Sequence, residues 1–324
     1  MPKKVATRAA YGKALVKLGE VNPDVVVLDA DLAKSTKTDE FAARFPGRFF
    51  DMGIAEADMM GTAAGLAAAG KIPFASTFAV FAAGRAFDQV RQVIGYTGLN
   101  VKICATHGGI TVGEDGASHQ SVEDIALMRA IPGMTVIVPA DAVETEKAVF
   151  AAARHKGPVY IRLGRSGVPV IFDEGYSFEI GRAAVLREGG DVTFIACGAL
   201  VSSCLEAASR LATESGVSAR VLNMATIKPA DCDAVIAAAR DTGAIVTAEE
   251  HSVIGGLGSA VCEITAEGCP VPVERVGIRD VFGQSGTAEE LLEAYGLLAE
   301  DIVKAALRAI QRKHRTGRET DLRR

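Results

Sequence analysis

The chain has 324 residues, of which 49% are hydrophobic and 23% charged, so its composition excludes a disordered or fibrous protein and its length predicts two domains. Its 35 Lys and Arg against 40 Asp and Glu give a net charge of −5, which argues against nucleic acid or an anionic membrane as a partner. The N-terminal residues show no signal-peptide pattern, and 6 cysteines without CxxC spacing favour reduced thiols in a cytoplasmic protein.

In the first half of the chain, apolar strand-like runs alternate with helix-like runs. This alternation is typical of a parallel sheet covered by helices on both faces. Strands are expected at 24–30, 73–77, 101–106, 134–139 and 158–163. Helices are expected at about 8–20, 55–70, 81–96, 121–131 and 141–155. We therefore predict one α/β domain over residues 1–165.

Residues 166–190 lose this periodicity and are rich in glycine, which predicts a linker. Beyond it the alternation resumes and predicts a second, mostly parallel α/β domain over residues 191–312. Its strands are expected at 191–197, 218–223, 243–250 and 271–277, with late helices near 287–296 and 299–312. The final residues, 313–324, are basic and almost without apolar side chains, so we expect a solvated tail.

Common motifs of phosphate, zinc and serine chemistry are missing from the sequence. It contains no GxxxxGK[ST], no HExxH and no GxSxG, and the glycine cluster at 255–258 lacks the third glycine of a dinucleotide fingerprint. The acidic pair and histidine at 249–251 could suggest a metal, but a charged strand end is the preferred interpretation. We predict no metal ligands on this chain.

Glu56 is the most informative polar residue of the first domain. It begins a predicted helix of small and apolar residues, with no Lys or Arg nearby in the sequence. A carboxyl group held in apolar surroundings can share a proton with a ring nitrogen near neutral pH. The simpler alternative is a carboxylate favoured by the helix dipole, and a buried salt bridge at this position in the assembled enzyme would argue against the catalytic interpretation.

Two further segments lie near the expected ends of strands. Phe78 and Phe81 are three residues apart where a strand passes into a helix, a spacing that is also common in ordinary cores. The glycine-rich loop 106–120 carries His107, Asp115 and His119 directly after the next strand. Imidazoles beside a carboxylate suit proton transfer and hydroxyl recognition, although solvated loop histidines are the alternative.

Three motifs in this order resemble the pyrimidine-binding half of transketolase, a thiamine diphosphate enzyme: GIAE at 53–56, STFxxF at 76–81 and GEDGxxHQ at 113–120. The resemblance covers residues 5 to about 310. It also includes ATR at 6–8, ADLAKS at 30–35 and GIRDVFGQSGTAEELLEAYGL at 277–297. It implies transfer of a two-carbon ketol unit from a ketose or ketose phosphate to an aldose or aldose phosphate, as in pentose phosphate metabolism.

The resemblance implies cofactor-binding roles for four residues. Glu56 corresponds to the catalytic glutamate that bonds the aminopyrimidine of thiamine diphosphate, while Phe78 and Phe81 correspond to the pocket wall. Asp31 corresponds to a residue that helps to hold the cofactor across a dimer interface, with a structural cap as the alternative. Where the family often has an aromatic residue, this chain has Gly84, for which Phe87 is a partial substitute.

The resemblance also implies substrate-binding roles. Asp115 and His107 would contact the donor sugar, and His119 would both bind it and assist proton transfer as a catalytic residue. Arg8, Ser35 and Arg165 correspond to residues that hold the sugar phosphate. A pair of guanidinium groups matches the geometry of such an oxyanion.

Full-length transketolases carry an earlier domain with a GDG motif that binds Mg²⁺ and the cofactor diphosphate, and no GDG occurs here. We therefore expect the carboxy-terminal subunit of a split transketolase, active with a separate N-terminal subunit that holds Mg²⁺. Two copies of this chain would meet through their pyrimidine domains at a twofold axis of a heterotetramer. No motif specifies the sugars that are used or the identity of the partner.

Three alternatives to this interpretation stay open. The β subunit of a 2-oxo acid dehydrogenase shares the architecture and a similar glutamate, and 1-deoxyxylulose-5-phosphate synthase shares the HQ segment. A noncatalytic scaffold subunit that kept the fold is the alternative from another class. The combination of THGG with GEDGASHQ at 106–120 favours transketolase among them.

Overall fold

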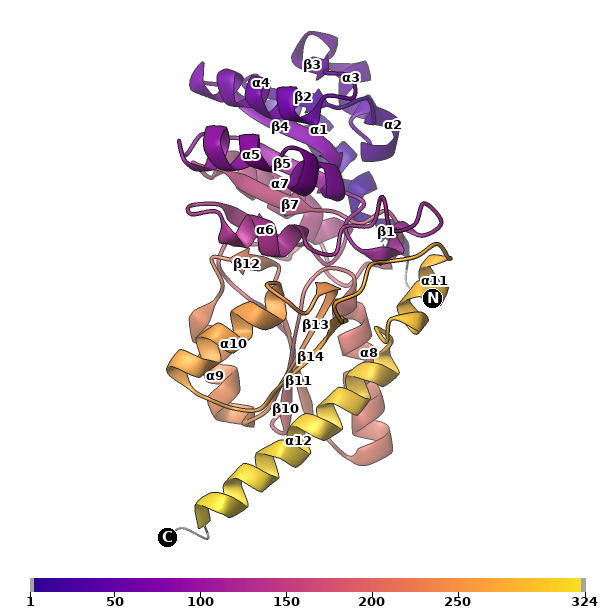
Figure 1. Cartoon of the computed structure of the whole chain (residues 1–324), viewed down its shortest axis with the longest axis vertical. Coiled ribbons are helices and arrows are strands. Elements are labelled where there is room, and N and C mark those ends of the chain that lie inside the picture. The colour runs from indigo at the N-terminus through magenta and orange to yellow at the C-terminus, as the bar shows by residue number, and fades with distance from the viewer. Residues whose placement is uncertain (1–2, 322–324) are drawn as a thin grey trace.

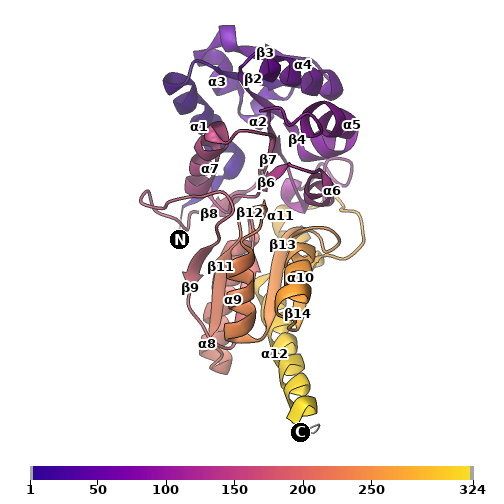
Figure 2. The ribbon, with the colours of Figure 1, turned by 90° about the vertical axis from the view of Figure 1, so that its left-hand side faces the viewer.

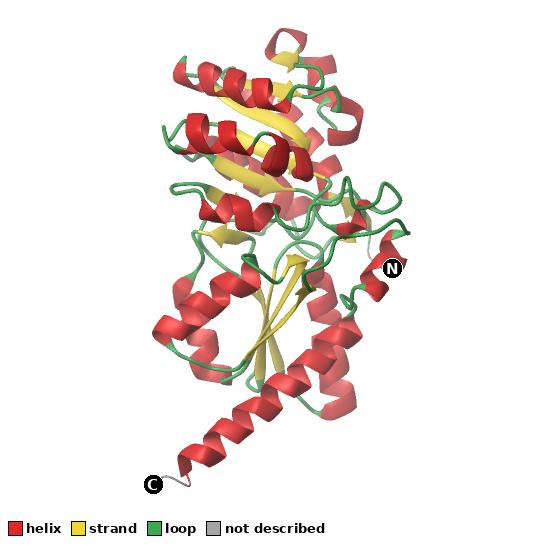
Figure 3. Cartoon of the chain, viewed as in Figure 1, coloured by secondary structure: helices red, strands yellow, loops and turns green. Residues whose placement is uncertain are grey.

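The computed structural model describes residues 3–321, which form two α/β units stacked end to end (Figure 1). The N-terminal unit contains the first sheet and its helices, and the C-terminal unit contains the second sheet. The last helix runs along the outside of the second unit (Figure 1). In both units the strands lie in the middle and the helices outside them (Figure 3). This arrangement confirms the predicted α/β class with two mostly parallel sheets.

The first sheet has seven strands in the order β12-β6-β7-β5-β4-β2-β3. All neighbouring strands are parallel except β12, which pairs with β6 in the antiparallel sense. The strands are β2 (Val25–Asp29), β3 (Phe49–Asp51), β4 (Ile72–Phe78), β5 (Lys102–Thr106), β6 (Thr135–Ile137), β7 (Val159–Arg162) and β12 (Thr226–Lys228). Their central runs are fully buried because helices cover both faces, as the continuous apolar sequence predicts.

Helices α1 and α7 cover one face of this sheet, while α4, α6 and a π-helical segment cover the other (Figure 2). The helices are α1 (Thr7–Val21), α2 (Ala33–Thr36), α3 (Asp39–Arg44), α4 (Glu56–Ala68), α5 (Phe87–Gln89), α6 (Asp124–Ala130) and α7 (Ala142–Arg154). Two short 3-10 helices are η1 (Pro46–Arg48) and η4 (Ile110–Val112), and two short π-helices are η2 (Phe81–Arg85) and η3 (Val90–Gly95). The helix expected at 81–96 is thus split into the two π-helical segments η2 and η3 around α5.

The second sheet has five strands in the order β14-β13-β10-β11-β9, of which only β9 is antiparallel to its neighbour. Its strands are β9 (Ala184–Arg187), β10 (Val192–Ala196), β11 (Ala219–Asn223), β13 (Ile245–Ser252) and β14 (Val273–Ile278). The helices beside it are α8 (Leu200–Ser215), α9 (Cys232–Thr242), α10 (Leu257–Gly268), α11 (Ala288–Ala294) and α12 (Ala299–Asp321). Helices α8 and α12 lie on one face and α9 and α10 on the other (Figure 2).

Two expectations about irregular segments need correction. The predicted linker 166–190 contains β8 (Gly167–Pro169), which pairs with β1 (Lys4–Ala6), and also contains β9. The expected tail at 313–324 is helical as far as Asp321, because it continues α12, its Lys, Arg and Glu residues favour a helix and no proline interrupts it. Residues 322–324 of that tail lie outside the described residues.

No helix within residues 3–321 is long and apolar enough to span a membrane.

Candidate active site

The predicted site residues gather at the carboxyl ends of the first sheet's strands. Phe78 ends β4, His107 directly follows β5, and Glu56 begins α4. In parallel α/β sheets this edge is where ligands bind, because loops from neighbouring strands converge there. The sheet topology therefore brings together side chains that are far apart in the sequence, such as Glu56 and His107, which are separated by 51 positions.

His107 is buried and fixed in one orientation. Its Nε2 lies 3.2 Å from Arg8 Nη1, its Nδ1 lies 2.8 Å from Thr106 Oγ1, and its ring stacks on Phe78 at 3.7 Å. Burial, followed by the positive charges of Arg8 and Arg165, lowers the pKa of His107 to about 3. A guanidinium can only donate, so Nε2 of the neutral ring accepts and Nδ1 carries the hydrogen.

We therefore expect His107 to stay neutral, with its hydrogen on Nδ1, across the physiological pH range. Histidine in an unfolded chain has a pKa of about 6.5, so the unfolded state takes up this proton first. The contribution of His107 to stability is then full above about pH 6.5 and falls as the pH drops toward 3. Nitrogen-15 NMR of the imidazole measures both features, and a ring protonated on Nε2 at pH 7 would contradict the assignment.

The aromatic side chains of the site form one cluster around His119. Phe78 and Phe81 lie nearly parallel, with ring centroids 5.7 Å apart. The half-buried ring of His119 meets both of them edge-on, at 6.2 Å and 5.6 Å. Ser118 Oγ lies 2.9 Å from its Nδ1. The structure thus brings both loop histidines into contact with the phenylalanine pair.

Glu56 is buried, but its surroundings are not apolar as expected. Arg85 Nη1 donates to both carboxyl oxygens, at 2.9 Å and 3.1 Å. The side chain of Glu56 is 2% exposed, whereas that of Arg85 is 51% exposed, so the ion pair opens to solvent on one side. No local sequence signal predicts this pairing, because the two residues are 29 positions apart and meet only when η2 folds beside α4. The carboxylate is thus ion-paired in this structure.

The expected anion-binding residues lie on the other side of His107. Arg8 on α1 donates through Nη1 to the Ser35 carbonyl oxygen at 2.8 Å. Burial, followed by the positive charge of Arg165, lowers the pKa of Arg8. Asp29 shapes the turn that carries Ser35, because it accepts hydrogen bonds from Leu32 N and from two threonine hydroxyls. Arg8 is therefore in direct contact with the backbone of Ser35.

Arg165 faces the glycine-rich loop. Its Nη1 donates to the carbonyl oxygen of Val112 and to Glu114 Oε2, and it lies 3.9 Å from Asp115 Oδ2. Asp115 is exposed. A sugar hydroxyl or an anionic group can therefore reach both Arg165 and Asp115 from solvent.

The structure does not join Asp31 and Phe87 to this cluster. Asp31 is exposed, has a positive φ of 61°, and donates from its backbone N to Asp51 Oδ1. Phe87 packs against the hydrophobic core below α4, so it does not replace the aromatic residue missing at Gly84. Arg85 is the side chain that covers Phe81 instead, with Cζ 4.4 Å from the ring centroid.

The second unit holds the glycine-rich loop in place, which the sequence did not reveal. Glu250, at the end of β13, accepts a hydrogen bond of 2.7 Å from Thr111 N. Gln120 Nε2 donates to two carbonyl oxygens of its own loop and to that of Gln284 in the second unit. Gly109 has a φ of 90° and leaves no room for a Cβ beside Glu250. The residues at 249–251 therefore lie in the last part of β13, as expected, and are also buried supports of the loop.

Replacing Glu250 with Ala should loosen this loop. The substitution leaves Thr111 N without its acceptor, at a cost of about 1–3 kcal/mol. We expect faster hydrogen exchange at the amides of residues 109–113. Glu263→Ala, which removes an exposed partner of Arg129, is the matched control and should leave their exchange unchanged. Equal protection of these amides in Glu250→Ala would contradict the supporting role.

A buried ion pair anchors the same junction. Arg162, the last residue of β7, donates from Nε to Asp124 Oδ2 at 2.8 Å, and Tyr160 donates to the same oxygen. Arg162 also donates to the carbonyl oxygens of Ser121 and Glu250. Burial alone would raise the pKa of Asp124, but the Arg162 guanidinium holds it below its usual range. The pair therefore ties the loop, β7 and the second sheet together.

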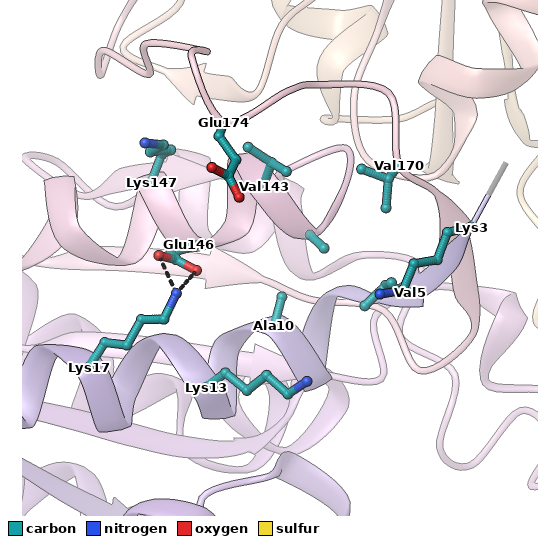
Figure 4. A pocket seen from close by; sticks show the side chains of 11 residues that line it. Lys3, Val5, Ala10, Lys13, Lys17, Val143, Glu146, Lys147, Val170 and Glu174 are labelled. Atoms are coloured by element: carbon teal, nitrogen blue, oxygen red, sulfur yellow. Dashed lines mark hydrogen bonds and ion pairs between the residues drawn. The ribbon is translucent and has the colours of Figure 1, made fainter.

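A cavity of about 670 Å³ lies away from this site, between α1, α7 and the chain near Glu174 (Figure 4). Lysines line much of it, and Lys17 pairs with Glu146 at 2.8 Å. None of the predicted site residues lines it.

Two known domains match this chain. The pyrimidine-binding domain of transketolase matches residues 3–170, and the C-terminal domain of transketolase matches residues 181–302. The chain belongs to the transketolase family. Both domains fall on the two units described above, and the chain's GEDGxxHQ loop lies in the first of them.

Relatives of similar length are transketolase subunits. A solved structure of a split-gene transketolase, an inactive β4 tetramer, is 59% identical with a TM-score of 0.90, covering 95% of this chain and 99% of that one. The 6-deoxy-6-sulfo-D-fructose transketolase subunit SqwH of Clostridium sp. is 48% identical, covering 95% of each chain. One of the subunits of the apulose-4-phosphate transketolase of Phocaeicola vulgatus is 40% identical, covering 95% of this chain and 98% of its own. The recognition of a split transketolase subunit is thus confirmed.

Proposed function

We propose that this transketolase-family chain is the C-terminal, pyrimidine-binding subunit of a split transketolase that transfers a two-carbon ketol unit from a ketose to an aldose. The observation that carries the proposal is the cluster of Glu56, Phe81, His107 and His119 at the carboxyl ends of the strands. The family match supplies the reaction class, and the geometry supports the role of each residue in it.

The residues of the cluster fit the aminopyrimidine ring of thiamine diphosphate. A planar, nitrogen-bearing group already rests on them in this structure, since the Arg85 guanidinium lies over Phe81 and bonds Glu56. A flat ring whose nitrogen shares a proton with a carboxyl group would meet the same aromatic face and the same Glu56 side chain. When bound, thiamine diphosphate supplies the carbanion chemistry of the ketol transfer, which no protein side chain can provide.

Each side chain then has a physical task. Glu56 would hold a proton at the ring nitrogen of the pyrimidine, and the phenylalanine pair would exclude water from that contact. His107, neutral and fixed by Arg8, would present a ring whose protonation does not change near pH 7. His119 is the more accessible imidazole and would assist proton transfer at the donor sugar.

The arginines favour a substrate that carries an anionic group. Arg8, Ser35 and Arg165 would hold it, while Asp115 would receive a donor hydroxyl. Two relatives are named for ketoses with such a group, a sulfonate in one and a phosphate in the other. We therefore propose a ketose with a terminal phosphate or sulfonate as donor, which includes the sugars of pentose phosphate metabolism.

The proposed enzyme needs a partner. We propose that Mg²⁺ and the cofactor diphosphate are bound by a separate N-terminal subunit, and that two copies of each chain form a heterotetramer. The names of the relatives as transketolase subunits and the inactive β4 tetramer of one of them support this division. We also propose boundaries at 1–165 and 191–312 for the two domains, and a cytoplasmic location, supported by six cysteines that form no disulfide.

Reconstitution with the N-terminal subunit tests the proposal. Ketol transfer between a ketose phosphate and an aldose phosphate should depend on both subunits, thiamine diphosphate and Mg²⁺. Decarboxylation of a 2-oxo acid would instead favour a dehydrogenase β subunit, and condensation of pyruvate with an aldose phosphate would favour a 1-deoxyxylulose-5-phosphate synthase. A complex with no turnover in any of these assays would favour a scaffold.

A further inference from the structure

Arg85 makes two contacts at once with groups that the proposed function assigns to the cofactor. Its Nη1 lies 2.9 Å and 3.1 Å from the two carboxyl oxygens of Glu56. Its guanidinium carbon lies 4.4 Å from the centroid of the Phe81 ring. A guanidinium is planar, positively charged and rich in N–H donors, so it satisfies a carboxylate and an aromatic face together.

We propose that Arg85 occupies the cofactor's pyrimidine site while the cofactor is absent, so that its guanidinium must leave Glu56 and Phe81 before the aminopyrimidine ring can bind. The proposal rests on the proposed function, because it takes these two side chains as the binding surface for that ring. It makes Arg85 a residue that sets cofactor affinity, although it has no catalytic task of its own.

Replacement of Arg85 by the pyrimidine ring avoids leaving the buried charge of Glu56 without a partner. Glu56 is 2% exposed, and a carboxylate with so little solvent contact is costly when it has no donor. Arg85 supplies donors while the site lacks cofactor, and a proton shared with the ring nitrogen would neutralise the carboxylate once the pyrimidine ring is bound. Since Arg85 is 51% exposed, its guanidinium can swing outward and regain water.

The local backbone allows that movement. Arg85 ends the π-helical segment η2, and it follows Gly84, which is exposed and has no neighbouring atom near the position of a Cβ. No bulky side chain at position 84 therefore blocks the outward path. Gly84, which stands where an aromatic residue is expected, thus leaves space for the outward movement of the Arg85 side chain.

Calorimetric titration of the reconstituted complex with thiamine diphosphate in Mg²⁺ tests the proposal. Removal of the competing group in Arg85→Ala should tighten binding about tenfold, which corresponds to about 1.4 kcal/mol. Arg85→Met, which keeps the length of the side chain and lacks the charge, should tighten it similarly. Arg91→Ala removes an exposed arginine from η3 and should leave affinity unchanged. Unchanged or weaker binding in both Arg85 variants would overturn the proposal.

A stability measurement gives a second readout without turnover. The isolated Arg85→Ala chain should unfold at a lower temperature than the wild-type chain, because Glu56 loses its donor. In the complex, saturating cofactor should remove most of that difference, and a difference that persists at saturation would overturn the proposal. If Arg85→Ala does not fold, Arg85→Lys serves in both assays, since it keeps the charge without the planar fork and should give intermediate affinity.

These outcomes separate the inference from the proposed function. If Glu56→Gln abolishes turnover while both Arg85 variants bind cofactor as the wild type does, the function stands and the inference fails. If Glu56→Gln binds and turns over normally, the proposed function fails first.

Discussion

Glu56→Gln should lower the turnover of the reconstituted enzyme by about 10²–10⁴-fold, the range expected when a general acid–base group is lost. The amide has the same size but cannot hold the proton at the pyrimidine nitrogen. The side chain is buried and its only described polar partner is Arg85, so the fold should persist. Steady-state ketol-transfer kinetics measure the loss, and circular dichroism confirms the fold.

The matched control is Glu146→Gln on α7. Glu146 also pairs with one cation, Lys17 at 2.8 Å, but it lies on the surface away from the strand ends. The turnover of the Glu146→Gln enzyme should equal that of the wild type. A Glu56→Gln enzyme within about threefold of wild type would contradict the assigned role.

Asp124→Ala should cost about 3–5 kcal/mol of the free energy of unfolding, the largest stability effect expected in this chain. The substitution leaves the Arg162 charge buried, with side-chain exposure of only 6%, and deprives the Tyr160 hydroxyl of its acceptor. Urea unfolding at pH 7 measures the change. Glu146→Ala, which breaks an exposed ion pair, should cost less than about 1 kcal/mol.

The pH dependence of the Asp124–Arg162 pair follows from the direction in which the pKa of Asp124 is shifted. The folded pKa of Asp124 lies below its usual value, so the unfolded state takes up the proton first. The contribution of the pair is therefore full above about pH 4 and is lost as the pH falls toward the folded pKa. An Asp124→Ala chain as stable as the wild type at pH 7 would show that Arg162 finds other partners.

The long apolar strands were the part of the fold that the sequence could predict. β2 and β5 are fully buried strands with apolar centres, and such apolar runs stand out from their polar flanks. β12 and β9 have 3 and 4 residues and are set by their neighbours rather than by any pattern of their own. The same holds for the π-helical break after Phe81, since no local residue type signals it.

The site could be predicted where a motif carries it. His107, His119 and the two phenylalanines lie in motifs, and the structure brings all four together. Their roles with cofactor and substrate stay predictions. Arg85 could not be found in the same way, because its partner is 29 residues away and the pairing depends on how η2 sits beside α4.

The second unit illustrates a different limit. The sequence suggests a charged strand end at Glu250, and charged residues are usually exposed. In the structure Glu250 is buried against Thr111, and Arg162 donates to its carbonyl oxygen. Only long-range contact distinguishes an exposed acid from a buried one, and a single sequence does not contain that contact. The loop that carries His107 and His119 is thus supported from outside its own domain.

The crossing of β12 into the first sheet constrains any attempt to divide this subunit. Thr226–Lys228 belongs to the second half of the chain, yet it covers the outer edge of β6. An N-terminal fragment ending near residue 190 would expose that edge, with its unpaired amides and carbonyls, to other copies. The two halves are therefore interlocked, and self-aggregation is the natural fate of the first half when it is produced alone.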